Sequence, residues 1–176
     1  QYGLTRAWDI GSGSYDTVLK SVASQAIIPA SVFFKPDGTR MYILNNYNQY
    51  VYQYSMSTAW DLANASYNSK SFHVGGEASN PYTAIINLAG TKMFIMDASS
   101  KKVHQYTLST PWDVSTASYD TEALDVSGQD SIPYGLFINN TEDRMYIAGS
   151  TGDKVYQYSL DNDFAGTGFV SINYKL

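Results

Sequence analysis

The sequence of 176 residues contains no cysteine and few charged side chains. Without cysteine the chain has no disulfide scaffold, no thiolate metal site and no cysteine nucleophile. Charged residues make up 15% of the chain, and the net charge is −5. The longest basic run is the pair Lys101 and Lys102, so we expect no nucleic-acid binding through phosphate neutralisation. No apolar run approaches the length of a membrane span, so we expect no membrane insertion.

The chain also has no initiator methionine and no signal-peptide pattern. It begins at Gln1, inside a motif that returns later, so we expect that it was processed or cut from something longer. With so few charges, the polar surface must come mainly from Ser, Thr, Asn and Gln. Such a surface suits an extracellular, cell-surface or virion protein, and this is the predicted location.

The chain does contain a repeat with a period of 52 residues. Trp8, Trp60 and Trp112 are spaced by this step, and an aspartate follows each of them. The spacing holds over three units without insertion or deletion, which makes it the main organising feature of the chain. The same step links Tyr15, Tyr67 and Tyr119; Pro29, Pro81 and Pro133; Met41, Met93 and Met145; Val51, Val103 and Val155; and Tyr54, Tyr106 and Tyr158.

Each unit has the pattern of four short strands. In the third unit, residues 134–139 are apolar, residues 144–149 and 154–160 alternate, and residues 117–126 just before them give a more polar strand. Alternation with a period of two and many β-branched and aromatic residues favour strands over helices. Glycine in the turns PDGT and LAGT supplies a positive φ easily. The third turn, NTED at residues 140–143, lacks glycine, so we expect it to be built differently.

Four antiparallel strands in a repeat of this length are typical of a β-propeller blade. A stacked-sheet solenoid is the alternative, but bulky residues on both strand faces favour blades that pack on two neighbours. The predicted fold class is therefore all-β, with blades at residues 27–78, 79–130 and 131–176 of a single, partial propeller domain over residues 1–176. We expect residues 1–26 to hold an orphan outer strand, at about residues 14–22, and a linker. Residues 169–176 are the expected fourth strand of the third blade.

The segment PDGTRMYILNNYNQYVYQYSM, residues 36–56, resembles the YVTN-type repeat of lactonase-like β-propellers. The longer unit with STAWD and ASYD resembles propeller repeats of phage tail-fibre and bacterial surface proteins. The resemblance covers about residues 1–160, and it departs at the turn of residues 140–143 and at Phe164, where the repeat predicts tryptophan. It implies the propeller fold, with a lactonase-type activity as one possible function.

Three blades are too few to close a ring, because propellers typically have about four to eight. An open stack would expose apolar blade faces and unpaired sheet edges. Two copies could form a six-bladed ring, or the remainder of a longer chain could complete it. We expect homo-oligomerisation, in which the outer strand could be exchanged with a neighbour.

The Trp-Asp pair recurs between the third and fourth strands. We expect a packed tryptophan and an aspartate that caps a turn, rather than a sugar-binding pair. Tyr-Gln-Tyr is expected to be strand packing, and the repeated methionines are expected to fill the core.

No catalytic or metal-binding residue is predicted. His73 and His104 occupy different repeat positions, and His104 stands where the other units have tyrosine. Neither histidine has a suitably spaced carboxylate or second histidine, so a metal site or a base–nucleophile pair is not supported. The segment DNDFAG, residues 161–166, departs from a calcium loop at Ala165. We therefore expect no cofactor and no enzymatic activity.

Loops that differ between the units are the candidate binding surface, although drift in solvated loops explains the differences equally well. They are residues 45–50, 97–102 and 149–154, and residues 23–29, 75–81 and 127–133, which share one face of a propeller. The candidate ligand-binding residues are Tyr47, Asn48, Tyr50, Glu77, Asp97, Lys102, Gln129, Asp130 and Asp153.

The predicted function is a non-catalytic recognition or assembly module on a cell or virion surface. A cell-surface glycan is the expected ligand, because tyrosine and amide side chains offer stacking and hydrogen bonds without strong charge. A lactonase-like hydrolase is one alternative. A structural spacer or decoration domain, whose only partners are copies of itself, is another.

Overall fold

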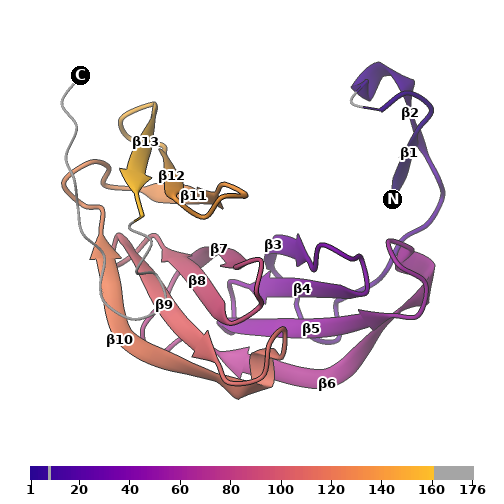
Figure 1. The fold of residues 1–176 in the computed structure, drawn as a ribbon, viewed down its shortest axis with the longest axis horizontal. Coiled ribbons are helices and arrows are strands. Elements are labelled where there is room, and N and C mark those ends of the chain that lie inside the picture. The colour runs from indigo at the N-terminus through magenta and orange to yellow at the C-terminus, as the bar shows by residue number, and fades with distance from the viewer. Residues whose placement is uncertain (8, 161–176) are drawn as a thin grey trace.

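The computed structural model describes residues 1–7 and 9–160, and this part of the chain is all-β (Figure 1). Antiparallel sheets follow one another around an open arc, with the N-terminal hairpin at one end and the third sheet at the other. This confirms the predicted class, propeller blades in an open, incomplete ring. Within residues 1–7 and 9–160, no helix is long and apolar enough to cross a membrane.

Two of the sheets are four-stranded blades in which the strands pair in chain order. Blade 1 contains β3 (Pro29–Phe34), β4 (Arg40–Asn45), β5 (Tyr50–Met56) and β6 (Ala65–His73). Blade 2 contains β7 (Pro81–Ile86), β8 (Lys92–Asp97), β9 (Lys102–Leu108) and β10 (Ala117–Asp125). Blade 3 has three described strands, β11 (Pro133–Ile138), β12 (Arg144–Gly149) and β13 (Lys154–Ser159). The strand expected at residues 169–176, the DNDFAG segment and Phe164 lie outside the described residues.

A short hairpin precedes blade 1. Its strands are β1 (Tyr2–Leu4) and β2 (Gly13–Tyr15), with Tyr2 opposite Tyr15. The expected outer strand at residues 14–22 is therefore shorter than predicted, and it has a partner. The repeat explains this difference: Tyr2 stands one period before Tyr54, so residues 2–4 continue the pattern of a third strand.

The core lies between the blades, where alternate side chains of each strand meet the next sheet. Tyr42, Leu44 and Val51 of blade 1 pack against residues of blade 2, and the opposite face of blade 2 packs on blade 3. The repeated methionines are core residues as predicted, with Met41, Met93 and Met145 all buried. The sandwiching of each sheet explains why both faces of its strands carry bulky residues.

The turns between the first two strands of each blade have the same backbone conformation. The φ angles of Gly38 and Gly90 are +73° and +74°, and Glu142 adopts +55° at the same repeat position. The prediction of a differently built third turn is therefore wrong. Asn139 accounts for this, because its side chain accepts from the Arg144 backbone N–H and donates to Thr141 and Asp143, which fixes the turn without glycine.

In the Trp-Asp connections the aspartates cap turns as expected, whereas the expected packing of tryptophan holds for Trp112, which is 8% exposed, and not for Trp60, which is 53% exposed. Each aspartate accepts a hydrogen bond from a backbone N–H two residues later and caps a short 3₁₀ helix. These helices are η1 (Ile10–Ser12), η2 (Leu62–Asn64) and η3 (Val114–Thr116). The indole rings of Trp60 and Trp112 lie against Gly38 and Gly90.

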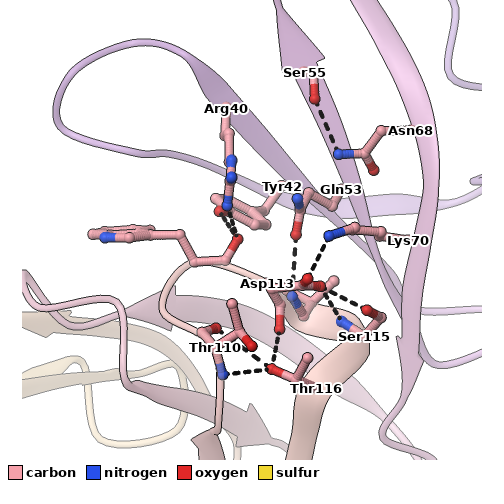
Figure 2. Close-up of polar contacts among 12 residues, drawn as sticks. Arg40, Tyr42, Gln53, Ser55, Asn68, Lys70, Thr110, Asp113, Ser115 and Thr116 are labelled. Atoms are coloured by element: carbon pink, nitrogen blue, oxygen red, sulfur yellow. Dashed lines mark hydrogen bonds and ion pairs between the residues drawn. The ribbon is translucent and has the colours of Figure 1, made fainter.

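Blade 1 holds this connection from blade 2 through a set of polar contacts (Figure 2). We call Trp112–Val114 the latch segment of blade 2, because it crosses onto blade 1. Its Trp112 carbonyl accepts from Tyr42 at 2.8 Å, and its Val114 N–H donates to Gln53 Oε1 at 3.0 Å. Two further contacts bind it: Arg40 also donates to the Trp112 carbonyl, and Lys70 forms an ion pair with Asp113.

Candidate functional site

The two sets of variable loops meet at one face of the blades. In blade 1 the Asn45 side chain, at the end of β4, accepts from the Ile28 backbone N–H at 3.0 Å. In blade 2 Asp97 accepts in the same way from the Asn80 N–H at 2.7 Å. Each inter-blade loop is therefore tied to the second-to-third-strand loop of the blade that it enters, and the candidate residues share this face.

The candidate residues of blade 1 stay within their own loop. The ring of Tyr47 is 64% exposed. The Asn48 amide donates to the Tyr52 hydroxyl at 2.7 Å, and the ring of Tyr50 lies 4.8 Å from that of His73. Of these three residues, Tyr47 is therefore the one whose ring is mostly exposed and could contact a ligand over a wide area.

Two candidates anchor loops to a buried tyrosine of the third strand. Glu77 accepts a hydrogen bond from the Tyr106 hydroxyl at 3.2 Å, and Gln129 accepts one from Tyr158 at 3.0 Å. Gln25 does the same for Tyr54 in blade 1. Because the contact recurs in all three blades, it positions the loop whatever else the side chain does.

In blade 3, Asp130 supplies the contact that β4 and β8 provide in the other blades. Gly149 stands at the repeat position of Asn45 and Asp97, and a Cβ there would lie 2.0 Å from Asp130 Cγ. Asp130 accepts from the Ile132 N–H at 2.8 Å and from the Gly152 N–H at 2.9 Å. In blade 3 the carboxylate therefore comes from the inter-blade loop instead of the end of the second strand, and it still accepts a hydrogen bond from a backbone N–H of that loop. The last candidate, Asp153, lies exposed in the β12–β13 turn with φ of +51°.

The three candidates of blade 2 are brought together around His104. This histidine is only 5% exposed, and Asp97, Glu77 and Lys102 are close enough to affect its charge. Burial lowers the pKa of His104 below its ordinary value, although Asp97 and Glu77 act in the opposite direction. The imidazole is therefore neutral at pH 7 and can accept a proton.

Sequence reasoning missed a serine next to this histidine. Ser100, half-buried in the β8–β9 turn, has its Oγ 3.2 Å from His104 Nε2. On the other side of the ring, Nδ1 lies 3.4 Å from the Tyr119 hydroxyl. A hydroxyl, a base and a third group that orients the base are the usual parts of an activated nucleophile. The signal was present in the repeat, since Asn48 and Tyr52 occupy the same two positions in blade 1.

The β8–β9 turn, which carries Ser100, is fixed by hydrogen bonds to Asp97. Asp97, which is fully buried, accepts from the backbone N–H of Ser100 and from the hydroxyl of Ser99, both at 2.8 Å. Burial alone would raise the pKa of Asp97, but hydrogen bonds from Ser100, Ser99 and Asn80 outweigh it and lower the pKa. An ionised carboxylate thus fixes the loop. No cluster of three potential metal ligands occurs within residues 1–7 and 9–160.

The fold is that of a β-propeller, seen here as an open, incomplete ring. The sequence matches no protein-family model and no curated protein, but solved structures share the fold. A protein of Bacteroides uniformis, proposed to be a 6-phosphogluconolactonase, is 11% identical with a TM-score of 0.64, covering 99% of this chain and 50% of its own. A second such protein, from Bacteroides fragilis, is 11% identical with a TM-score of 0.57, covering 77% and 35%. The periplasmic gluconolactonase of Pseudomonas aeruginosa is 13% identical with a TM-score of 0.53, covering 81% and 40%.

These comparisons correct one prediction and support an alternative. The expectation that the chain is not an enzyme is contradicted by the similar structures, which carry lactonase names. These names support the lactonase-like alternative better than the recognition module. The chain spans half or less of the length of these proteins, and at such low identity the likeness shows the fold alone. It does not bear on the predicted tail-fibre context or extracellular location.

Proposed function

We propose that this chain is part of a lactonase-like hydrolase in which Ser100 and His104 are the catalytic pair. The observation that carries the proposal is the 3.2 Å contact between Ser100 Oγ and His104 Nε2 on the loop face of blade 2. The lactonase names of proteins with the same fold support the reaction class. A lactone is a cyclic ester, and a serine beside a neutral histidine is suited to attack an ester carbonyl.

The tautomer required for this chemistry fits the contacts of the ring. If Nδ1 carries the proton, it donates to the Tyr119 hydroxyl, and Nε2 is left as an acceptor facing Ser100. Burial keeps the imidazole neutral, because it lowers the pKa of His104. Tyr119 is thus a positioning residue, and the base is ready at neutral pH.

The proposed reaction has two steps. Ser100 Oγ attacks the lactone carbonyl carbon while His104 Nε2 takes the hydroxyl proton. The bond between the carbonyl carbon and the ring oxygen then breaks, and His104 returns the proton to that oxygen. This leaves an ester on Ser100 and a new hydroxyl on the opened ring. A water molecule, deprotonated by His104, then attacks the ester carbonyl. The bond to Ser100 Oγ breaks, His104 returns the proton to Oγ, and the hydroxy acid is released.

The charges around the pair favour a substrate with a negative group. Lys101 and Lys102 follow Ser100 directly, and both are half-buried beside the turn. They would attract an anionic substituent such as a phosphate, while the exposed Tyr47 on the neighbouring loop offers a ring for a sugar face. We therefore propose a sugar lactone as the substrate class.

Hydrolysis of δ-gluconolactone and its 6-phosphate, followed by proton release, tests the proposal. Ser100→Ala should lower kcat/KM about a hundredfold or more. His104→Tyr should do the same without unfolding the chain, because the repeat has tyrosine at Tyr52 and Tyr156. Ser57→Ala, at an exposed serine just after β5 in blade 1, is the matched control and should keep the wild-type rate.

The pH profile adds a second readout. The rate should rise as the pH passes through the pKa of His104, which lies below its ordinary value because of burial. The proposal fails if the wild-type chain opens neither lactone, or if Ser100→Ala keeps the wild-type rate.

A further inference from the structure

The hydrogen bond between the latch segment and Gln53 of blade 1 has a counterpart one repeat earlier in the chain. In the first, the Val114 N–H donates to Gln53 Oε1 at 3.0 Å. In the second, one repeat earlier, the Leu62 N–H donates to Gln1 Oε1 at 3.4 Å. Because the two donors and the two acceptors are each one period apart, the contact is a property of the repeat and not of one pair of blades.

The outward face of blade 3 carries the residues that receive this segment in blade 1. Arg144, Tyr146 and Gln157 stand two periods after Arg40, Tyr42 and Gln53. Their strands have the same register, since Tyr146 is paired with Gln157 as Tyr42 is with Gln53. Among the residues that the structure describes, the Arg144 guanidinium contacts only the neighbouring Asp143, so it can reach a new acceptor.

This face of blade 3 is exposed, whereas the corresponding face of blade 1 is covered by blade 2. Val155 is 70% exposed, whereas Val51 at the same position of blade 1 is 1% exposed. Phe137 is 58% exposed, whereas its counterpart Phe33 stacks on Trp112 with ring centroids 6.4 Å apart. Apolar side chains and hydrogen-bonding groups thus stand together, in an arrangement that binds a latch segment elsewhere in the same chain.

At the other end of the arc, the N-terminal hairpin carries a latch segment of the same type. Trp8, Asp9 and Ile10 repeat the positions of Trp112–Val114. Asp9 accepts from the Gly11 N–H at 3.0 Å and caps η1, as Asp113 caps η3. Ile10 is 91% exposed, whereas Val114 is fully buried. Asp9 and Ile10 therefore have the capped conformation of the latch segment but lie in solvent.

We propose that the outward face of blade 3 is the docking surface for a second copy of this chain, which binds through Asp9 and Ile10. Gln157 Oε1 accepts from the Ile10 N–H, and Arg144 and Tyr146 donate to the backbone of the docked segment, as Arg40 and Tyr42 donate to the Trp112 carbonyl. Phe137 and Val155 are covered in the process. The two surfaces lie at opposite ends of the arc in Figure 1, so the contact is head-to-tail. Two such contacts close a ring of two copies.

Self-association of the full chain gives the first test. Sedimentation velocity from about 1 to 200 µM should show a reversible species of twice the 19.5 kDa chain mass. Ile10→Asp should raise the dissociation constant about tenfold or more, because burying an isoleucine contributes at least that factor. Leu19→Asp alters another exposed aliphatic residue, 71% exposed and outside the segment, and should leave the dissociation constant unchanged.

Directed crosslinking identifies the surfaces themselves. Because the chain has no cysteine, Ile10→Cys and Gln157→Cys can be introduced singly and mixed with a short bismaleimide. Rapid crosslinking in the mixture, and not with Leu19→Cys in place of Ile10→Cys, is the expected result. A chain that stays monomeric at all concentrations overturns the proposal, and so does a dimer that Leu19→Asp weakens while Ile10→Asp does not. Far-UV circular dichroism confirms that each variant is folded.

Discussion

Gly90 lies directly beneath the indole ring of Trp112, and replacing it with alanine is a direct test of the packing between strands and latch segment. A Cβ at Gly90 would lie 2.3 Å from both Cδ1 and Nε1 of the ring. The φ angle of Gly90 is +74°, a conformation that side chains with a Cβ disfavour. Trp112 is 8% exposed and stacks on Phe33 across the blade interface, so the ring has little room to move.

The expected loss of stability is the sum of two effects. The left-handed conformation costs an L-residue about 1–2 kcal/mol. Overpacking at a site that cannot relax costs about 1–3 kcal/mol more. Gly90→Ala should therefore lower the free energy of unfolding by roughly 2–5 kcal/mol, out of the 5–15 kcal/mol typical of a whole domain. For a chain of this size, this corresponds to a fall in Tm of about 5–15 °C.

Urea unfolding followed by tryptophan fluorescence measures the effect. Gly76→Ala is the matched control, because no atom lies within 4 Å of its added Cβ, and it should stay within about 0.5 kcal/mol of the wild type. Trp112→Phe, which trims the ring, should relieve part of the loss in the double variant. The third unit has this combination, with Glu142 in place of the glycine and Phe164 in place of the tryptophan. A folded Gly90→Ala variant with wild-type stability would refute the reasoning.

Two further predictions concern the loop carboxylates. Asp130→Ala and Gly149→Asp should each lower Tm, but the double variant should recover stability beyond the sum of the two, because it recreates the Ala78 and Asp97 arrangement of blade 2; additive losses in a thermal-melt double-mutant cycle would count against this. Because its hydrogen bonds lower the pKa of Asp97, its contribution to stability is complete above the ordinary carboxyl pKa and is lost as the pH falls below it. Asp97→Asn, the residue type found at Asn45, should therefore lose less stability between pH 7 and pH 3 in urea titrations than the wild type.

The strands could be predicted from the sequence because successive side chains point to opposite faces of a strand, and β-branched and aromatic residues recur on both faces. β12 occupies the expected residues 144–149, and β13 and β10 end one residue before the expected ends. The 52-residue spacing then gave the same boundaries in every unit. Residue type is sufficient here, since which face a strand side chain points to depends only on its position.

The third turn shows where residue type is insufficient. Absence of glycine suggested a different turn, yet Glu142 takes the same conformation with φ of +55°. Hydrogen bonds from Asn139 and the Asp143–Arg144 pair stabilise it, and their geometry exists only once β11 and β12 have paired. A few such contacts are enough to offset the modest cost of a positive φ.

The candidate ligand residues lie in variable polar loops, where a polar side chain can either fix the loop or bind a ligand. Glu77, Gln129 and Asp130 are polar because each accepts hydrogen bonds that fix a loop. The same atoms could bind a sugar. Sequence variability cannot separate the two roles, because a loop with few backbone partners needs side-chain acceptors whether or not it meets a ligand.

Paired departures from the repeat distinguish packing from chemistry. Blade 3 departs from the repeat at both Gly149 and Asp130. Even so, a carboxylate, here that of Asp130, still accepts a hydrogen bond from the Ile132 N–H. Ser100 with His104 also departs in two places, and a hydrogen bond again joins the pair, as one joins Asn48 and Tyr52 at 2.7 Å. The difference lies in what the bond can do. An amide and a phenol exchange no proton near neutral pH, whereas a hydroxyl and a neutral imidazole can. The proposed reaction makes use of this difference.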